Sequence, residues 1–341
     1  MKELKVNNIS DNIIFKSINP YDNLSFNSLK GNDLLDILFL LNQSFVTYRD
    51  KLNIEKSTSI GTEIEFENVS AVGRGIISSY ILLKGMEWDL KEDGSLLQGL
   101  EVTSPILHDD PKCWNELKEI CMECSKHGTI LSNAGGHVHI GSQILGNDIK
   151  NWLNFIRLWA AYENIIIRFL NGEYITSRQS LATFARPVKD NYIEYLDLFK
   201  NEKFLKNMLH IINDTRNKGI NFFNTDADDN IDYEILGNTI EFRCPNGSIN
   251  HIIWQNNINL LVKLLMYVKS PKYDLELING RLEKSKNIDY KLYNEIDIEE
   301  ALEFSDLIFD NNLDKVYFLI QYFKNFDYAY QPLIKAKKFT K

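Results

Sequence analysis

Three pairs of functional side chains, each separated by one apolar residue, constrain the fold of this sequence most. They are Glu63-Ile-Glu65, His137-Val-His139 and Glu241-Phe-Arg243. Successive side chains of a β-strand point to opposite faces, so each pair shares one face and the apolar residue between them lies on the other. We therefore predict three strands that present polar groups on one side and pack a hydrophobic core with the other.

The spacing within a pair also limits how a pair can bind metal. Residues i and i+2 of a strand lie roughly 6.6 Å apart, whereas paired catalytic metals lie about 3.5 to 4 Å apart. Glu63 and Glu65 therefore suit neighbouring ions better than a single ion, and other segments must supply further ligands. Asp93, in the turn Asp93-Gly94, and Glu101 are acidic candidates for this role.

The remaining pattern predicts an α+β fold with an antiparallel sheet. Alternating or β-prone residues predict strands over 57–66, 78–84, 87–90, 99–104, within 129–142 and over 239–243. Apolar residues at helical spacing predict helices over 111–127, 148–170, 192–212, 249–268, 298–309 and 313–330. We divide the chain into an N-terminal extension, 1–56, and a main domain, 57–341.

Composition excludes several classes of protein. With 341 residues, 44% of them hydrophobic, the chain can bury one large core or two smaller ones. A net charge of −9 argues against a nucleic-acid binder, because such proteins need a basic surface. No apolar run of about 18 residues and no signal-peptide pattern occur, so we expect a cytoplasmic protein without a membrane partner. The four cysteines are expected to be structural thiols.

Each polar pair by itself has a second interpretation. Glu63 and Glu65 could form the solvated face of a strand, and Glu241 with Arg243 could be a structural ion pair. His137 and His139 could belong to a metal-dependent hydrolase or oxygenase. Together, however, carboxylates, imidazoles and an arginine on separate strands are what a multi-ion site handling phosphate requires. Oxygen-rich ligation favours Mg²⁺ or Mn²⁺ over Zn²⁺.

The order of these motifs resembles the amidoligase family, relatives of glutamine synthetase and glutamate-cysteine ligase. The resemblance extends from about residue 59 to residue 263 and rests on the joint occurrence of four segments. These segments are Gly61-Thr-Glu-Ile-Glu-Phe66, Trp88-Asp89 through Asp93-Gly-Ser95 to Glu101-Val-Thr-Ser-Pro105, Asn133-Ala-Gly-Gly-His-Val-His139 and Thr239-Ile-Glu-Phe-Arg243.

The resemblance implies an ATP-dependent carboxylate-amine ligase that forms an amide or peptide-like bond through an acyl phosphate. It also implies a curved antiparallel sheet of the glutamine synthetase catalytic-domain type, with helices on the convex face and two or three Mg²⁺ or Mn²⁺ ions on the concave face. The expected substrates carry a carboxylate and an amine, and are small molecules, peptides or proteins. A degenerate ligase that only binds its ligands is a third possibility, beside the hydrolase or oxygenase.

The same resemblance assigns roles residue by residue. Glu63 and Glu65 would bind separate metals, Asp93 and Glu101 would complete one shell, and His137 with Glu241 would complete another. His139 would lie near the nucleotide phosphates, Arg243 would hold the γ-phosphate, and Asn133 would orient the carboxylate substrate.

Two further arginines are candidates for binding phosphate or a substrate carboxylate. Arg178 and Arg186 lie in a polar segment, 171–190, that could cover the sheet, although they could equally be exposed loop residues. The sequence contains no glycine-rich Walker loop, and phosphate binding by metals would make one unnecessary.

Overall fold

A computed structural model of the chain describes residues 22–28, 48–131, 133–171, 181–212, 217–225, 237–290, 293 and 295–323, without the side chains of residues 171, 181 and 182. Its centre is a six-stranded sheet in the order β2-β3-β1-β4-β6-β5, with every neighbouring pair antiparallel. The predicted α+β fold with an open antiparallel sheet is therefore confirmed. The strands are β1 (Ile60–Phe66), β2 (Asp89–Glu92), β3 (Leu100–Thr103), β4 (Gly136–Gly141), β5 (Ile220–Asn221) and β6 (Thr239–Phe242).

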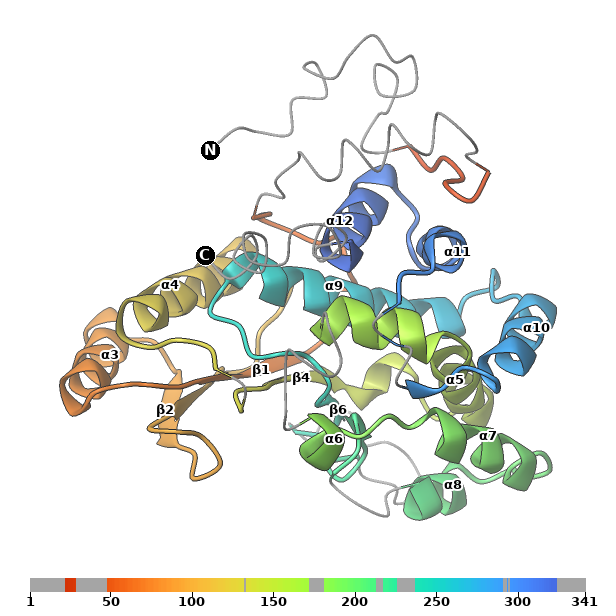
Figure 1. The fold of residues 1–341 in the computed structure, drawn as a ribbon, viewed down its shortest axis with the longest axis horizontal. Helices are drawn as coiled ribbons and strands as arrows, with labels where there is room; N and C mark the ends of the chain where they lie inside the picture. The colour runs from red at the N-terminus through yellow and green to blue at the C-terminus, as the bar shows by residue number, and fades with distance from the viewer. Residues whose placement is uncertain are drawn as a thin grey trace, which may run out of the picture.

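One face of the sheet is apolar and covered by helices (Figure 1). Ile64, Val102, Val138 and Phe242 are fully buried and occupy paired positions on β1, β3, β4 and β6. The helices are α3 (Ala71–Lys84), α4 (Pro111–His127), α5 (Ile149–Asn171), α6 (Leu181–Phe184), α7 (Lys189–Leu198), α8 (Leu205–Ile212), α9 (His251–Val268), α10 (Leu275–Ser285), α11 (Ile298–Ile308) and α12 (Asn312–Tyr322). A short 3-10 turn, Ser142–Ile144, follows β4.

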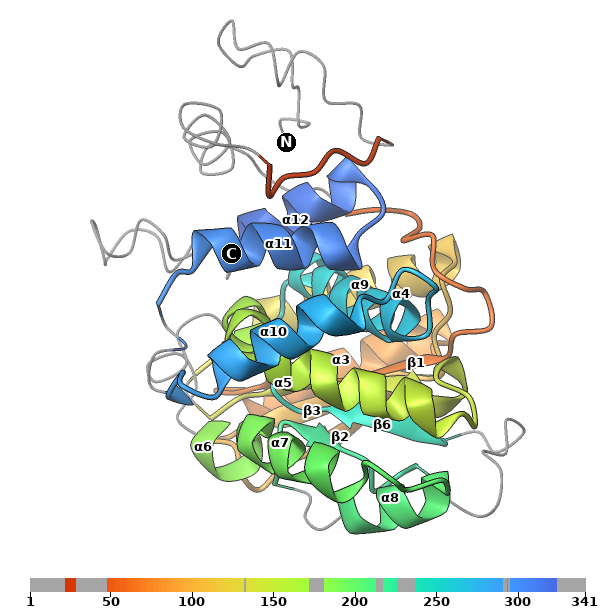
Figure 2. The same cartoon turned by 90° about the vertical axis from the view of Figure 1, so that its right-hand side faces the viewer.

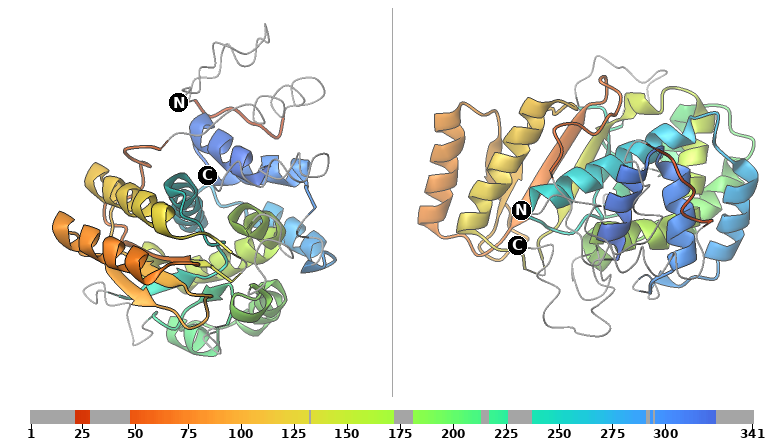
Figure 3. Two further views of the ribbon diagram at one scale, coloured as in Figure 1. Left: turned by 60° about the vertical axis from the view of Figure 1, so that its left-hand side comes forward. Right: turned by 90° about the horizontal axis from the view of Figure 1, so that it is seen from above.

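The helices form layers that can be followed in two further views. Helices α3 and α4 lie side by side over the half of the sheet that holds β2, β3 and β1, and α9 packs next to α4 (Figure 3). Helix α10 runs along α5, while α11 and α12 form an outer layer over α9 (Figure 2). In the described part of the chain, no helix combines the length and apolarity needed to cross a bilayer.

Local sequence explains where the main helices begin. The Asp110 side chain accepts a hydrogen bond from Cys113 N, and Pro111 occupies the first turn of α4, where its missing N–H costs nothing. Asn250 caps α9 in the same way through Ile252 N. The predicted helices over 111–127, 148–170, 249–268 and 298–309 are confirmed to within a few residues.

The predicted strand over 78–84 is wrong, because this segment belongs to α3. Ser70 caps the helix through Gly73 N, and Gly85 ends it in the left-handed conformation with φ of 63°. Ile77 and Ile81, four residues apart, bury the same helical face. Tyr80 and Ile81 are residue types that favour a strand, but both caps and the spacing of four between buried residues decide for a helix.

Other elements also differ from the predictions. The single helix predicted over 192–212 is divided into α7 and α8, and α10 and the two-residue strand β5 were not predicted. The helix predicted over 313–330 is α12 as far as Tyr322, and residues after 323 lie outside the described part.

The described part of the N-terminal extension is joined to the body by many hydrogen bonds. Phe26 is buried, and Asp306 on α11 accepts hydrogen bonds from Phe26 N and Asn27 N, both at 2.9 Å. Farther along, Asp109 accepts from Leu52 N at 2.8 Å and from Ile54 N at 3.1 Å. A boundary at residue 56 remains a prediction.

Replacing Asp109 by alanine should lower the free energy of unfolding by about 2 kcal/mol, because three donors lose their acceptor. These donors are the two backbone amides of Leu52 and Ile54 and the indole of Trp114, at 2.8 Å. Urea unfolding measures the change. Asp89→Ala, at an exposed position on β2, is the matched control. Equal stabilities of both variants would contradict this role of Asp109.

Candidate metal and phosphate site

The face of the sheet opposite the helices carries the polar pairs, and strand register brings them together. Glu63 on β1 is opposite His137 on β4, and Glu65 is opposite Glu101 on β3. His139 is opposite Glu241 on β6. Because opposite residues in adjacent strands point to the same face, side chains separated by up to 102 residues in sequence, as His139 and Glu241 are, become neighbours.

Glu63 lies at the centre of this arrangement. Its carboxylate contacts His137 Nδ1 through one oxygen and His139 Nε2, at 3.0 Å, through the other. Burial by itself would raise the pKa of Glu63, but the hydrogen bonds and charges of both imidazoles outweigh burial and hold its pKa well below the ordinary value. Glu63 is therefore an ionised group shared by two histidines.

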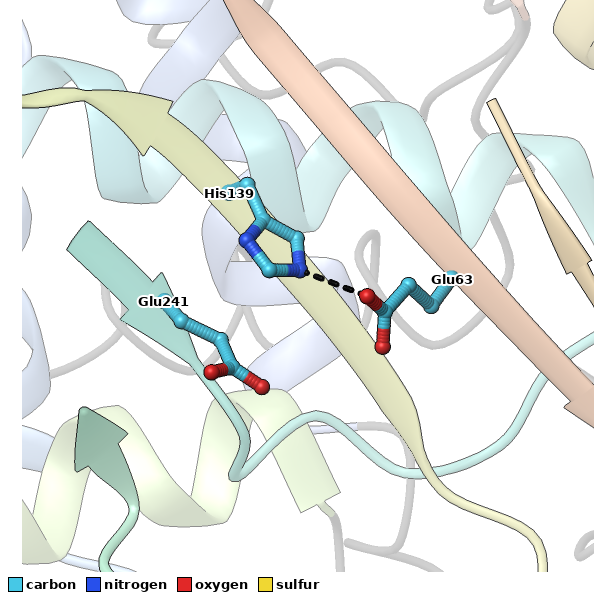
Figure 4. Close-up of side chains that lie close together, drawn as sticks. All are labelled: Glu63, His139 and Glu241. Carbon is cyan, nitrogen blue, oxygen red and sulfur yellow. Dashed lines mark hydrogen bonds and ion pairs between the residues drawn. The ribbon is translucent and has the colours of Figure 1, made fainter. Parts of the chain in front are cut away.

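Three overlapping groups of side chains could each hold a cation, and in each the ligand atoms lie within 4.8 Å of one another. One group extends over β1, β4 and β6, and Figure 4 shows its three side chains converging from these strands. The three groups are Glu63 with His139 and Glu241, Glu63 with Glu101 and His137, and Glu65 with Asp93 and Glu101. Glu63 and Glu101 each belong to two of them.

The candidate ligand atoms suit hard divalent cations that also accept an imidazole nitrogen as a ligand. Five carboxylates and two imidazoles supply mostly oxygen, which Mg²⁺ and Mn²⁺ prefer. His137 Nε2 is buried, has no hydrogen-bond partner among the described residues, and lies 3.6 Å from Glu65 Oε1. A buried nitrogen with a free lone pair beside a carboxylate is what a cation would satisfy.

Clustered carboxylates repel one another when no cation is bound. Burial raises the pKa of Glu101, and the negative charge of Glu63 adds to this increase. The pKa of His139 is also raised, although burial alone would lower it, because the hydrogen bond and charge of Glu63 outweigh burial. Without a cation, the site therefore favours bound protons.

Arg243 lies at the β6 end of this face and is paired with Glu241. Its Nη1 donates to Glu241 Oε1 at 2.5 Å, and its Nε donates to the carbonyl of Phe184 at 3.3 Å. The second oxygen of Glu241 accepts from Asn221 Nδ2 at 2.6 Å. Arg243 and Asn221 together fix the orientation of the Glu241 carboxylate beside His139.

The structure places the other predicted residues as follows. Asp93 lies in the β2–β3 turn, with Oδ1 accepting from Ser95 N at 2.7 Å, close enough to join Glu65 and Glu101. Asn133 lies in the loop before β4, two residues from Gly135, whose N–H donates to Glu65 Oε2 at 2.5 Å.

Arg186 is not part of the carboxylate and histidine cluster. It lines a separate pocket of about 640 Å³ with Lys189, Tyr290 and Tyr293, and its Nε donates to the carbonyl of Asn217 at 3.4 Å. Arg178 lies outside the described residues. Phosphate binding by these two arginines remains a prediction.

Two residues on the polar side of the sheet were missed by sequence reasoning. Asn221 lies in a two-residue strand far from any motif, and no sequence signal pointed to it. Glu67 continues the alternation of Glu63 and Glu65. Extending that alternation by two more residues would have predicted Glu67 on the same face. Glu67 is almost fully buried.

Comparison with known proteins gave one family match and weak structural similarities. A family model described as "Putative amidoligase enzyme" matches residues 78–265, more than half of the chain. No curated protein matches the sequence. A solved structure described as "GmaS/ADP complex-Conformation 1" has 11% identity and a TM-score of 0.42, covering 80% of this chain and 70% of its own. Another, "Crystal structure of novel glutamine synthase homolog", has 12% identity and a TM-score of 0.35, covering 77% and 71%.

Proposed function

This chain belongs to the amidoligase family, and from that premise we propose that it is an ATP-dependent carboxylate-amine ligase. The observation that carries the proposal is the convergence of three candidate cation groups with Arg243 on one face of the sheet. Such a face can bind several cations and a polyphosphate at once.

The proposed reaction has two steps. An oxygen of the substrate carboxylate attacks the γ-phosphorus of ATP, the bond to the bridging oxygen breaks, and ADP leaves. The amine nitrogen then attacks the acyl carbon, inorganic phosphate leaves, and the amine proton passes to solvent. Each step moves negative charge onto phosphate oxygens, so stabilising that charge is the main catalytic task.

The proposed roles follow from position. Bound Mg²⁺ or Mn²⁺ would neutralise phosphate charge and act as a Lewis acid. Glu63, Glu65, Asp93, Glu101, His137 and Glu241 would hold these ions, and the geometry adds His139 as a further candidate ligand. Arg243, oriented by Glu241, would contact the transferred phosphoryl group. Asn133 would help to orient the carboxylate substrate.

ADP release in the presence of carboxylates, amines and peptides, with Mg²⁺ or Mn²⁺, tests the proposal. We expect ADP only when a carboxylate and an amine are both present. Turnover without ATP would favour the hydrolase or oxygenase. Thermal stabilisation by nucleotide without any turnover would favour a binding protein. Activity that survives both Glu241→Ala and Arg243→Ala would exclude these residues from the mechanism.

At a pH below the raised pKa of His139, binding of Mn²⁺ should release a proton, because a metal ligand must be a neutral imidazole. Affinity should therefore fall as the pH decreases through that pKa. Calorimetry in two buffers of different ionisation enthalpy measures the release.

His139→Asn should remove this proton release. His251→Asn is the control, because burial lowers the pKa of His251 to about 4 and leaves it neutral at pH 7. Heats of binding that do not depend on the buffer would contradict the prediction.

A further inference from the structure

Glu67, the residue that follows β1, is a buried carboxylate whose role differs from that of the acidic residues on β1. Only 1% of its surface is exposed, and both of its oxygens accept hydrogen bonds from backbone amides. Oε1 accepts from Leu97 N at 2.9 Å and Oε2 accepts from Ala134 N at 3.2 Å. Glu67 belongs to none of the three candidate cation groups found among the described residues.

The two amides belong to loops that lead into the site. Leu97 lies four residues after Asp93, in the connection from β2 to β3. Ala134 lies three residues before His137, in the loop that enters β4. The carboxylate of Glu67 therefore joins the segment that carries Asp93 to the segment that carries His137.

Neighbouring hydrogen bonds fix this carboxylate relative to β1. Glu67 and Thr129 exchange two backbone hydrogen bonds, at 2.8 and 2.9 Å. Asn68 N donates to the carbonyl of Leu97 at 3.2 Å, so the same loop is held from two sides. Beside it, Glu65 Oε2 accepts from Gly135 N. The carboxylates of Glu65 and Glu67, two residues apart, thus bind consecutive amides of the loop before β4.

We infer that Glu67 is a positioning residue that holds the Asp93 loop and the Asn133–Gly135 loop in register with β1, so that the group of Glu65, Asp93 and Glu101 keeps its shape before any cation binds. This role rests on the proposed function. A buried carboxylate is costly unless hydrogen bonds compensate it, and backbone amides can supply those bonds. The two loops therefore satisfy the carboxylate of Glu67, and the carboxylate fixes the two loops.

The isosteric variant Glu67→Gln tests this inference. Its carbonyl oxygen can accept one backbone N–H, but its NH₂ group meets the second donor, so one loop loses its anchor. Glu123→Gln is the matched control. Glu123 is also buried, but among the described residues it pairs only with Lys126 and His127 on its own helix, α4. If Glu67→Gln does not fold, Glu67→Asp keeps the charge but is too short for both amides.

Two measurements on the full-length protein separate this role from the proposed function. Hydrogen exchange of the metal-free protein should show at least about tenfold faster exchange at Leu97 or Ala134 in Glu67→Gln, and unchanged rates there in Glu123→Gln. Mn²⁺ binding, followed by electron paramagnetic resonance, should weaken by about 10- to 100-fold for one ion and stay unchanged for the ion held by Glu63, His139 and Glu241.

Unchanged exchange at both amides would overturn the positioning role even if the protein is an active ligase. Faster exchange with wild-type affinity for every Mn²⁺ would also overturn it, because the loops would then not matter for the cation group. Failure of the unmodified protein to bind Mn²⁺ would overturn both this role and the proposed function.

Discussion

Glu63→Gln should reduce kcat/KM by at least about 10³-fold, the largest loss expected from any single change on the polar face. Glu63 is shared by two of the three candidate cation groups, so its loss weakens both. Lewis-acid stabilisation of phosphate charge is worth several kcal/mol, and each 1.4 kcal/mol corresponds to about tenfold in rate. The assay is ADP formation at saturating ATP and Mg²⁺.

The matched control for this prediction is Glu92→Gln. Glu92 is an exposed acid on the edge strand β2, where it pairs with Arg74 rather than with the cluster. We expect its activity to stay within twofold of the unmodified protein. A Glu63→Gln variant that keeps more than a tenth of the activity would show that the two groups containing Glu63 do not hold catalytic cations.

Trp159→Ala should lower the free energy of unfolding by about 4 kcal/mol, the largest expected effect on stability. Trp159 is fully buried, its ring lies 5.7 Å from that of Phe242, and its indole N–H donates to Glu163 Oε1 at 3.0 Å. Removing it leaves a cavity under β6 and takes one donor from a buried carboxylate. Urea unfolding of the metal-free protein measures the loss.

Two variants separate the causes of this loss. Trp159→Phe retains most of the packing and removes only the hydrogen bond, so about 1 to 2 kcal/mol should be lost. Phe204→Ala, at a side chain that is 67% exposed, should change stability by less than about 0.5 kcal/mol. A Trp159→Ala variant as stable as Phe204→Ala would show that Trp159 does not support the sheet.

Local patterns in the sequence were sufficient to predict most of the strands that carry the site. The alternation in Glu63-Ile-Glu65 and His137-Val-His139 sets which side chains share a face, whatever the strands pair with. Helices with clear caps, such as α4, were also predictable, because Asp110 and Pro111 mark its start. Such signals lie within a few residues of the element that they define.

Long-range pairing was not predictable from the sequence. No local signal states that Glu63 lies opposite His137, and therefore that Glu63 contacts both imidazoles. The same limit applies to the position of the His139 ring near both Glu63 and Glu241, while its place at the nucleotide phosphates stays a prediction. Asn221 was missed because its only link to the site is a hydrogen bond across β5 and β6.

The position of β4 between β1 and β6 has a consequence for assembly on the ribosome. Strands β1, β3 and β4 are complete by Gly141, but β6 begins at Thr239. At 5 to 20 residues per second, about 5 to 20 s of translation separate the two events. During that interval the nascent chain contains Glu63 and both histidines but lacks the carboxylate of Glu241, so the group of Glu63, His139 and Glu241 can close only after residue 241 has been made.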